Sequence, residues 1–444
     1  MSRGLIVASP HSGSGKTVLT LALLRALRRR GLRVVSAKAG PDFIDPAFHA
    51  AASGAPCRNL DCWAMRPVLL QAIVRRLASA GELILCEGVM GLFDGVGAGE
   101  RGSTAELAER LGWPVLLAVD AARQAASVAA LLEGFVRHRP NVKIAGVVFN
   151  RVASTRHAEI LEAAARAALP ELAVLGAVPR DPSLALPERH LGLVQAGEHP
   201  ELEAFLDRAA EIVGMHCDLA ALVALAEPLR LDGGRDAPDP LPPLGQRIAV
   251  AEDRAFAFAY PAVIEGWRAA GAEIAPFSPL ADEAPDPAAD AVYLPGGYPE
   301  LHARRLAANA RFLAGLRERA AKGVAIYGEC GGYMVLGRGL VDAEGVRHAM
   351  AGLLPVTTSF ATPRRHLGYR EAVLAAETPL GAAGARFRGH EFHYAGIVEA
   401  EGMPLFRVQD GGGSDLGAMG SVAGSVMGSF LHLIDRVELP ARIG

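Results

Sequence analysis

The 444-residue sequence contains no run of 18 consecutive apolar residues, although 51% of its residues are hydrophobic. A helix needs about 18 to 20 such residues to cross a bilayer, so we expect no membrane span. A signal peptide is also not expected, because the apolar run Leu5–Ala8 is too short and is soon followed by Pro10. Neither sign of charge predominates, since the chain has 45 basic and 48 acidic residues. The net charge of −3 argues against a nucleic-acid partner or an anionic membrane surface.

Cysteine is rare: five residues are scattered along the chain, at positions 57, 62, 86, 217 and 330. An odd number without regular spacing fits a reducing compartment better than a disulfide framework, so we expect a cytoplasmic protein. Cys57 and Cys62 are separated by four residues, but no second cysteine or histidine pair at ligand spacing accompanies them. We therefore expect no metal at this pair.

A chain of this length is too long for one ordinary core, and its first half repeats a strand, loop and helix pattern. The expected strands are short apolar runs, namely Gly4–Ala8, Arg33–Ala37, Glu82–Cys86, Val115–Val119, Ile144–Phe149 and Ala173–Ala177. Continuous apolar strands that alternate with helices are typical of a parallel sheet covered on both faces. The sequence therefore predicts an α/β domain over residues 1–226.

Residues 227–246 contain five prolines and three glycines, which oppose regular structure and predict an interdomain linker. The alternating pattern resumes after it and predicts a second α/β domain over residues 247–444. Its first expected elements are strands at Arg247–Ala251, Glu273–Phe277 and Ala291–Leu294, with a helix over residues 261–270.

A glycine-rich loop lies between the first strand and a helix expected over Val18–Arg30. Backbone N–H groups of such a loop cradle phosphate oxygens, a lysine contacts the β- and γ-phosphates, and a threonine hydroxyl ligates Mg²⁺. The loop departs from the full phosphate-loop pattern, because Pro10 stands where the first glycine is expected. We expect ATP to be bound by Ser12, Gly13, Ser14, Gly15, Lys16 and Thr17.

Acidic residues follow the second and third strands of the expected sheet. Asp42 and Asp45 follow the second strand, and Glu87 and Asp94 follow the third. Carboxylates at the carboxyl ends of parallel strands hold Mg²⁺ beside bound phosphates. We expect Thr17, Asp42 and Glu87 to ligate Mg²⁺, and Asp45 and Asp94 to position the substrate or the ion. The alternative is that the aspartates only form turns.

Asn150 and Arg151 follow the Ile144–Phe149 strand. In sheets of this class that position often contacts adenine, and we include both residues in the expected ATP site. The alternative is a helix cap.

A single cysteine stands in the stretch Ile326-Tyr-Gly-Glu-Cys-Gly-Gly-Tyr-Met-Val-Leu-Gly337. The apolar run 324–327 predicts a buried strand cut off by Gly328, and residues 333–336 are compatible with a helix. Cys330 on such a strand-to-helix turn has the geometry of an exposed nucleophile. The glycines permit positive φ, and the helix N-terminus favours the thiolate. The alternative is a buried, inert cysteine.

A cysteine nucleophile also needs an oxyanion hole and a base. The turn at Gly296 and Gly297 directly follows an expected strand and offers N–H groups for an oxyanion. His390, His393 and His432 are candidates for the base, and spacing does not choose among them.

Four motifs in this order resemble the signatures of one family, the cobyrinic or hydrogenobyrinic acid a,c-diamide synthases of corrin biosynthesis. They are Ala37-Lys-Ala-Gly-Pro-Asp-Phe-Ile-Asp-Pro46, Cys86-Glu-Gly-Val-Met-Gly-Leu-Phe-Asp94, Leu294-Pro-Gly-Gly-Tyr-Pro-Glu300 and Gly389-His-Glu-Phe-His-Tyr394. The resemblance covers essentially the whole chain. It implies two doubly wound α/β domains: a P-loop NTPase-like, dethiobiotin-synthetase-like ATPase, followed by a flavodoxin-like class I glutamine amidotransferase domain.

The resemblance also implies residue roles, with Cys330 as nucleophile and His432 as base. Most amidotransferases of this class carry a glutamate two residues after that histidine, and here the position is Ile434. Asp435 is adjacent but on the opposite face of an extended segment. The acid that orients His432 is therefore not identified from the sequence.

The implied activity is amidation of the a and c acetate carboxylates of hydrogenobyrinic or cobyrinic acid, with ATP, Mg²⁺ and ammonia from glutamine. Alternatives within the same chemistry are a nickel-sirohydrochlorin a,c-diamide synthase and a cobyric acid synthase. A partition-type ATPase with an inactive amidase-like domain is disfavoured, because His11 stands where those ATPases carry an extra lysine. We expect a homodimer.

Overall fold

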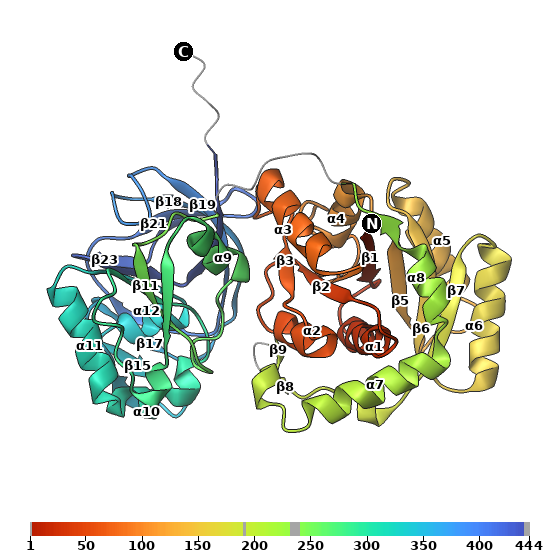
Figure 1. Cartoon of the computed structure of the whole chain (residues 1–444), viewed down its shortest axis with the longest axis horizontal. Coiled ribbons are helices and arrows are strands. Elements are labelled where there is room, and N and C mark those ends of the chain that lie inside the picture. The colour runs from red at the N-terminus through yellow and green to blue at the C-terminus, as the bar shows by residue number, and fades with distance from the viewer. Residues whose placement is uncertain (1, 190–191, 231–239, 439–444) are drawn as a thin grey trace, which may run out of the picture. The chain divides into compact units, whose positions relative to one another are not determined.

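The computed structural model describes residues 2–189, 192–230 and 240–438. The chain divides into two compact units (Figure 1). Unit 1 comprises residues 1–63 and 70–237, and unit 2 comprises residues 64–69 and 238–444. The short segment 64–69 therefore belongs with the C-terminal residues, although it lies early in the sequence.

Unit 1 is built on an eight-stranded sheet, of which seven strands follow the order β3-β2-β4-β1-β5-β6-β7 with all neighbours parallel; the eighth, β10 (Glu227–Pro228), pairs with β1. The strands are β1 (Arg3–Ala8), β2 (Val34–Ala39), β3 (Arg58–Leu60), β4 (Leu83–Glu87), β5 (Val115–Asp120), β6 (Ile144–Val152) and β7 (Ala173–Pro179). Six were predicted from apolar runs. The sequence analysis missed β3, which has three residues.

Helices connect these strands. They are α1 (Lys16–Arg29), α2 (Asp45–Ser53), α3 (Pro67–Ala80), α4 (Thr104–Leu111), α5 (Val128–His138), α6 (Thr155–Ala168), α7 (Leu202–His216) and α8 (Leu219–Leu225). Helices α1 and α7 lie side by side (Figure 1), and Arg25 of α1 binds Asp207 of α7 at 2.8 Å. The short strands β8 (Glu188–Arg189) and β9 (Gly192–Leu193) pair with each other.

Unit 2 contains a six-stranded sheet in the order β12-β11-β13-β14-β24-β23. Its strands are β11 (Arg247–Ala251), β12 (Glu273–Phe277), β13 (Ala291–Leu294), β14 (Ala325–Glu329), β23 (Ser421–Ala423) and β24 (Val426–Ser429). All neighbours are parallel except β23 and β24. The helices are α9 (Pro261–Ala269), α10 (Ala303–Ala308), α11 (Ala310–Ala321) and α12 (Gly331–Leu336).

Two further sheets in unit 2 were not predicted. One has the order β16-β15-β17-β20 and the other the order β22-β21-β18-β19-β25. Their strands are β15 (Gly339–Val341), β16 (Arg347–Ala349), β17 (Val356–Ser359), β18 (His366–Leu374), β19 (Arg386–His393), β20 (Gly396–Ala400), β21 (Phe406–Asp410), β22 (Asp415–Met419) and β25 (Leu431–Arg436). Several are half-exposed and polar, so they lack the continuous apolar runs that marked the parallel strands.

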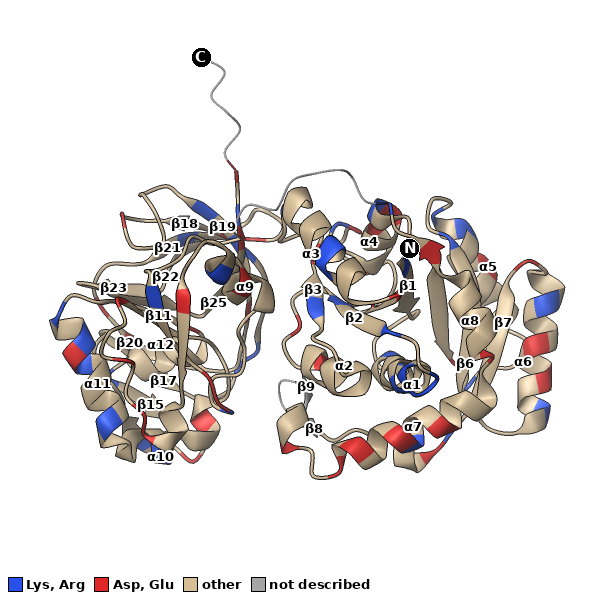
Figure 2. Cartoon of the chain, viewed as in Figure 1, with Lys and Arg blue, Asp and Glu red and all other residues tan. Residues whose placement is uncertain are grey.

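The expected linker, residues 227–246, lies partly within the described residues. Glu227–Pro228 forms β10, which pairs antiparallel with β1, and residues 231–239 lie outside the described residues. Among the described residues, no helix is both long and apolar enough to cross a membrane. Helices α6 and α7 each carry both basic and acidic residues (Figure 2), in keeping with the nearly balanced net charge.

The turn between β14 and α12 packs tightly on the end of β13. Strand β14 runs through Gly328 to Glu329, so the prediction that Gly328 ends it is wrong. Cys330 itself has the positive φ, +47°, whereas Gly328, Gly331 and Gly332 do not. A Cβ on Gly332 would lie 2.0 Å from the backbone oxygen of Leu294. These glycines are therefore required for close approach, and the turn strain falls on the cysteine.

We expect Gly332→Ala to lower the free energy of unfolding of unit 2 by about 1–3 kcal/mol, because a backbone oxygen cannot move aside as a side chain does. Urea unfolding followed by fluorescence measures this change. Gly396→Ala is the matched control, since its Cβ would meet nothing closer than 4.0 Å. Equal stability of the two variants would contradict this account of the turn.

Candidate active site

The phosphate loop has the backbone geometry predicted from its glycines. Gly13 and Gly15 both have φ of +80°, which L side chains rarely adopt. Lys16 begins α1, is buried, and donates from Nζ to the backbone oxygen of Met90 at 3.2 Å. Burial lowers the pKa of the Lys16 ammonium below its usual value.

Glu87, at the end of β4, is the centre of a buried polar network in unit 1. Its Oε1 accepts hydrogen bonds from Thr17 Oγ1 at 2.7 Å and from Lys38 Nζ at 2.8 Å. Its Oε2 lies 2.6 Å from Nε2 of His49 in α2. Lys38 also donates to Asp45 at 2.5 Å. The predicted metal ligands Thr17 and Glu87 are thus in direct contact.

The charges in this network stabilise one another. Burial alone raises the pKa of the Glu87 carboxyl, but Lys38 and His49 outweigh it and hold the pKa well below its usual value. Burial and the neighbouring Asp42 raise the pKa of Asp45 to about 6. Glu87 is therefore anionic at neutral pH, and its oxygens are the kind of hard ligand that Mg²⁺ prefers.

The other acidic candidates make turns. Oδ1 of Asp42 accepts from the backbone N–H groups of Ile44 at 2.7 Å and of Asp45 at 3.0 Å. Asp94 is exposed, and its Oδ2 accepts from the N–H of Gly91 at 2.8 Å. The predicted turns are therefore present at Asp42 and Asp94, whereas Asp45 binds Lys38; the metal and substrate roles of these aspartates stay predictions.

Asn150 contacts the phosphate loop directly. Its Nδ2 donates to the backbone oxygen of Ser14 at 2.9 Å, and Arg151 binds Asp120 at 2.5 Å. The helix that follows is capped by Ser154, whose Oγ accepts from the N–H of His157 at 3.2 Å. The alternative that Asn150 and Arg151 cap this helix is therefore wrong. Their contact with adenine stays a prediction.

Cys330 occupies a strained elbow in unit 2. Its backbone has φ of +47° and ψ of −104°, a conformation unusual for a non-glycine residue. Its N–H donates to the backbone oxygen of Ser429 on the neighbouring strand at 2.8 Å. Its Sγ lies 3.9 Å from the backbone oxygen of Phe392. Strain at one buried cysteine is more typical of a functional residue than of inert packing.

Gly296 lies between Cys330 and His432. A Cβ on Gly296 would be 2.2 Å from Cε1 of His432 and 3.1 Å from Cβ of Cys330. Gly297 is beside the elbow too, because a Cβ on Gly331 would be 3.0 Å from the Gly297 nitrogen. The structure thus brings together the predicted nucleophile, base and oxyanion turn. His390 lies opposite His432 in the β19–β25 ladder.

Glu329 is an acidic neighbour of His432 that the sequence analysis missed. Its Oε2 lies 3.9 Å from Nδ1 of His432. It accepts hydrogen bonds from the hydroxyls of Tyr293 at 2.7 Å and Tyr327 at 2.9 Å, and from the N–H of Leu433 at 2.9 Å. Burial raises the pKa of its carboxyl to about 7. The sequence offered one sign of this role: Glu329 is an acidic residue at the end of an apolar strand, immediately before Cys330.

Burial affects both members of the cysteine–histidine pair. It raises the pKa of the Cys330 thiol, although the Gly331 N–H at the start of α12 opposes this, so the expected thiolate is not the resting form. Burial, with His390 and His393, lowers the pKa of His432 to about 3. The resting pair is therefore a thiol beside a neutral imidazole.

Asp435 does not orient His432, in agreement with its place on the opposite face of the strand. Its carboxylate binds the guanidinium of Arg66 at 2.9 Å and accepts from the Arg66 N–H at 2.7 Å. This contact ties the segment 64–69 to β25 within unit 2.

Comparison with known proteins agrees with this division of the chain. Residues 5–194 match the model of the CobQ/CobB/MinD/ParA nucleotide binding domain. Residues 247–437 match the model of the CobB/CobQ-like glutamine amidotransferase domain. The first contains the phosphate loop and the Glu87 network, and the second contains Cys330 and His432.

Curated relatives match over nearly their whole length. The hydrogenobyrinate a,c-diamide synthase of Brucella anthropi is 56% identical, covering 98% of this chain and 98% of the relative. The enzyme of the same name from Rhizobium meliloti is 56% identical, covering 98% and 100%. That from Rhodobacter capsulatus is 54% identical, covering 97% and 98%. On this full-length similarity, with two matching domains that hold the sites described above, the chain belongs to the hydrogenobyrinate a,c-diamide synthase family.

Proposed function

We propose that this protein amidates the a and c acetate carboxylates of hydrogenobyrinic acid, using ATP and ammonia taken from glutamine. The observation that carries the proposal is the assembly of Cys330, Gly296 and His432 in unit 2, in a chain whose other unit holds a phosphate loop. An ammonia-releasing centre and a phosphate site in one chain are the two parts that an amide ligase needs. Full-length similarity to the named relatives supports the corrinoid substrate.

Glutamine hydrolysis uses Cys330 as nucleophile. Its sulfur attacks the side-chain amide carbon, and the resulting oxyanion is held by backbone N–H groups at Gly296 and Gly297. His432 takes the thiol proton and passes it to the leaving ammonia. Water, deprotonated by His432, then cleaves the thioester and releases glutamate. The imidazolium that forms in each step is stabilised by the Glu329 carboxylate, which acts as a positioning residue.

The synthase reaction activates a carboxylate, since a free carboxylate has no leaving group at neutral pH. A carboxylate oxygen of the corrinoid attacks the γ-phosphorus of ATP, ADP leaves, and an acyl phosphate results. Ammonia attacks the acyl carbon and displaces phosphate, giving the amide. Lys16 binds the β- and γ-phosphates, and Asp45 and Asp94 are our candidates for holding the substrate. Two such cycles amidate the two side chains.

Thr17 and Glu87 fit a Mg²⁺ ion that accompanies ATP, because a hydroxyl oxygen and a carboxylate oxygen already lie 2.7 Å apart there. Bound there, the ion would neutralise charge on the transferred phosphoryl group. Lys38 and His49 hold the Glu87 carboxylate in place and anionic. Asp42 has one oxygen engaged by backbone N–H groups, which leaves its other oxygen as a further ligand. The homodimer stays a prediction.

Cys330→Ala tests the amidase centre. We expect glutamine-dependent synthesis to fall by about 10³-fold or more, because the nucleophile is gone. Synthesis with ammonium salts should stay within about twofold of the wild-type rate, since the phosphate loop is untouched. The measurement is formation of the a,c-diamide under steady-state conditions, with each nitrogen donor in turn.

Lys16→Ala is the reciprocal variant for that experiment. It should lose synthesis with either nitrogen donor by about 10²-fold or more and keep a measurable glutaminase rate. Loss of ammonia-dependent synthesis in Cys330→Ala, or its retention in Lys16→Ala, would contradict the division of labour.

The substrate itself is tested by comparing hydrogenobyrinic acid with cobyrinic acid. We expect kcat/KM to be higher for the cobalt-free acid by about tenfold or more, equivalent to about 1.4 kcal/mol of transition-state stabilisation. Steady-state rates over a range of concentrations give the ratio. Nickel-sirohydrochlorin serves as the negative control. A preference for cobyrinic acid would overturn the substrate assignment and leave the amidase and ATP chemistry in place.

Glu329→Gln tests the positioning role. The carboxyl ionises as pH rises through about 7, so the glutaminase rate of the wild type should rise between about pH 6 and pH 8. In Glu329→Gln we expect kcat to fall about tenfold or more and this rise to disappear, since the amide stays neutral. Tyr293→Phe should move the rise to higher pH, because it removes a donor that favours the anion. An unchanged pH profile in Glu329→Gln would exclude the role.

A further inference from the structure

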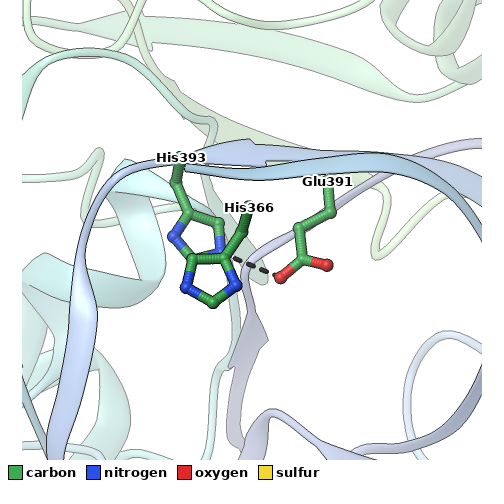
Figure 3. Close-up of side chains that lie close together, drawn as sticks. All are labelled: His366, Glu391 and His393. Atoms are coloured by element: carbon green, nitrogen blue, oxygen red, sulfur yellow. Dashed lines mark hydrogen bonds and ion pairs between the residues drawn. The ribbon is translucent and has the colours of Figure 1, made fainter. Parts of the chain in front are cut away.

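A cluster of two histidines and one glutamate lies on one face of the β18–β19 ribbon in unit 2 (Figure 3). His366, the first residue of β18, is directly opposite His393 in the antiparallel ladder. Glu391 is two residues before His393 and therefore on the same face. One nitrogen or oxygen atom from each side chain lies within 4.8 Å of the others. Two of the three residues belong to the Gly389–Tyr394 motif, to which the proposed reaction assigns no role.

The hydrogen bonds of His393 fix which ring nitrogen carries a proton. Nδ1 lies 3.0 Å from the backbone oxygen of Ala395, which only accepts, so Nδ1 is protonated. In the neutral ring the lone pair is then on Nε2, which lies 2.8 Å from Oε1 of Glu391. Two acceptors at this distance require a cation between them, either a proton or a metal ion. A histidine that donates its other N–H to a backbone carbonyl is the usual arrangement at metal sites.

Surrounding groups hold His393 and Glu391 in this orientation. The His393 ring is stacked between Phe430, at a centroid distance of 3.8 Å, and His366, at 4.7 Å. Arg370 donates to Oε2 of Glu391 at 2.7 Å, which turns Oε1 toward the histidines. Gly368, directly opposite Glu391, has no side chain, and a Cβ there would lie 2.9 Å from an Arg370 nitrogen.

We propose that His366, Glu391 and His393 form a binding site for a divalent transition-metal ion of the Zn²⁺ type. Two imidazoles and one carboxylate are a common ligand set for zinc, and water would complete the tetrahedron. Zinc bonds of about 2.0 Å would separate Nε2 and Oε1 to about 3.2 Å, a movement of a few tenths of an ångström. The exposed His366 ring, which is stacked on His393 with the ring planes 8° apart, would also rotate to direct a nitrogen at the ion. Mg²⁺ and Ca²⁺ are disfavoured, because they prefer sites made entirely of oxygen ligands.

The cluster does not include Cys330, but two of its residues lie on β19, the strand whose Phe392 contacts the Cys330 sulfur. The residue between Glu391 and His393 is Phe392, whose backbone oxygen faces the Cys330 sulfur. The site differs from that of the Mg²⁺ that accompanies ATP, which belongs to residues of unit 1. The inference does not depend on the corrinoid substrate, and metal binding is measured without activity.

The test uses the full-length protein carrying Cys330→Ala, so that the nucleophilic thiol does not bind zinc. We expect the chelator-treated protein to take up one Zn²⁺ per chain by elemental analysis after gel filtration, and Co²⁺ to give the visible absorption of a tetrahedral site. His366→Ala should weaken zinc binding by about tenfold or more in calorimetric titration. This variant is a safe choice because His366 is exposed.

His348→Ala is the matched control, since His348 also binds a carboxylate, Asp342 at 2.7 Å, and within the described part of the chain this pair belongs to no group of three possible metal ligands. It should take up zinc as the parent does. Glu391→Gln removes the carboxylate charge and should weaken binding as His366→Ala does. The proposal is overturned if the parent protein retains no zinc, or if His366→Ala and His348→Ala bind it equally. A proton would then be the cation between His393 and Glu391.

Discussion

Close backbone approach at Gly296 is the constraint on which the amidase centre depends. The carboxyl ends of β13, β14 and β24 are adjacent in one parallel sheet, so the turns that follow them must share a small volume. A Cβ at Gly296 would overlap His432 and crowd Cys330. The glycines therefore hold the nucleophile and the base at either side of one backbone segment. The strain is concentrated at Cys330, the residue whose side chain must be presented to substrate.

In unit 1 the arrangement of the phosphate site depends in the same way on one buried charge, the Glu87 carboxylate. Glu87 is completely buried, and a carboxylate there is stable only because Lys38, His49 and Thr17 satisfy its oxygens. These partners come from β2, α2 and α1, which are separate parts of the sequence. One side chain thereby fixes the relative positions of the phosphate loop and the second strand. The oxygen atoms that we propose as Mg²⁺ ligands and the lysine that we propose for the phosphates are held together as a consequence.

The parallel strands and the phosphate loop could be predicted from sequence because each has a local cause. Buried parallel strands are continuous apolar runs, and glycines mark turns. The two further sheets of unit 2, in which most neighbours are antiparallel, were missed, since their strands are stabilised by pairing with distant segments and several are partly exposed. Glu329 was missed for a related reason. The orienting acid was sought after His432 along the chain, whereas Glu329 is the last residue of β14 and immediately precedes Cys330.

Two further contacts that the sequence did not predict, His366 with His393 and Asp45 with Lys38, arise because the fold brings these residues together. His366 and His393 are far apart in sequence and become partners through the register of β18 and β19. Asp45 was expected to position the substrate or Mg²⁺, and in the structure it binds Lys38, a residue of β2. Asp42 forms the turn that precedes it. Spacing identifies residues that a motif holds together. It does not identify partners that a sheet brings together from separate strands.

Burial of the cysteine–histidine pair gives the centre a neutral resting state. Desolvation disfavours both the thiolate and the imidazolium, since each is a charge without water. A neutral thiol is a weak nucleophile and reacts slowly with oxidants. Forming the ion pair requires compensation, and in our proposal Glu329 supplies it on one side and N–H groups at Gly297 on the other. Both act on charges that appear during the reaction, so they stabilise the transition state more than the resting enzyme.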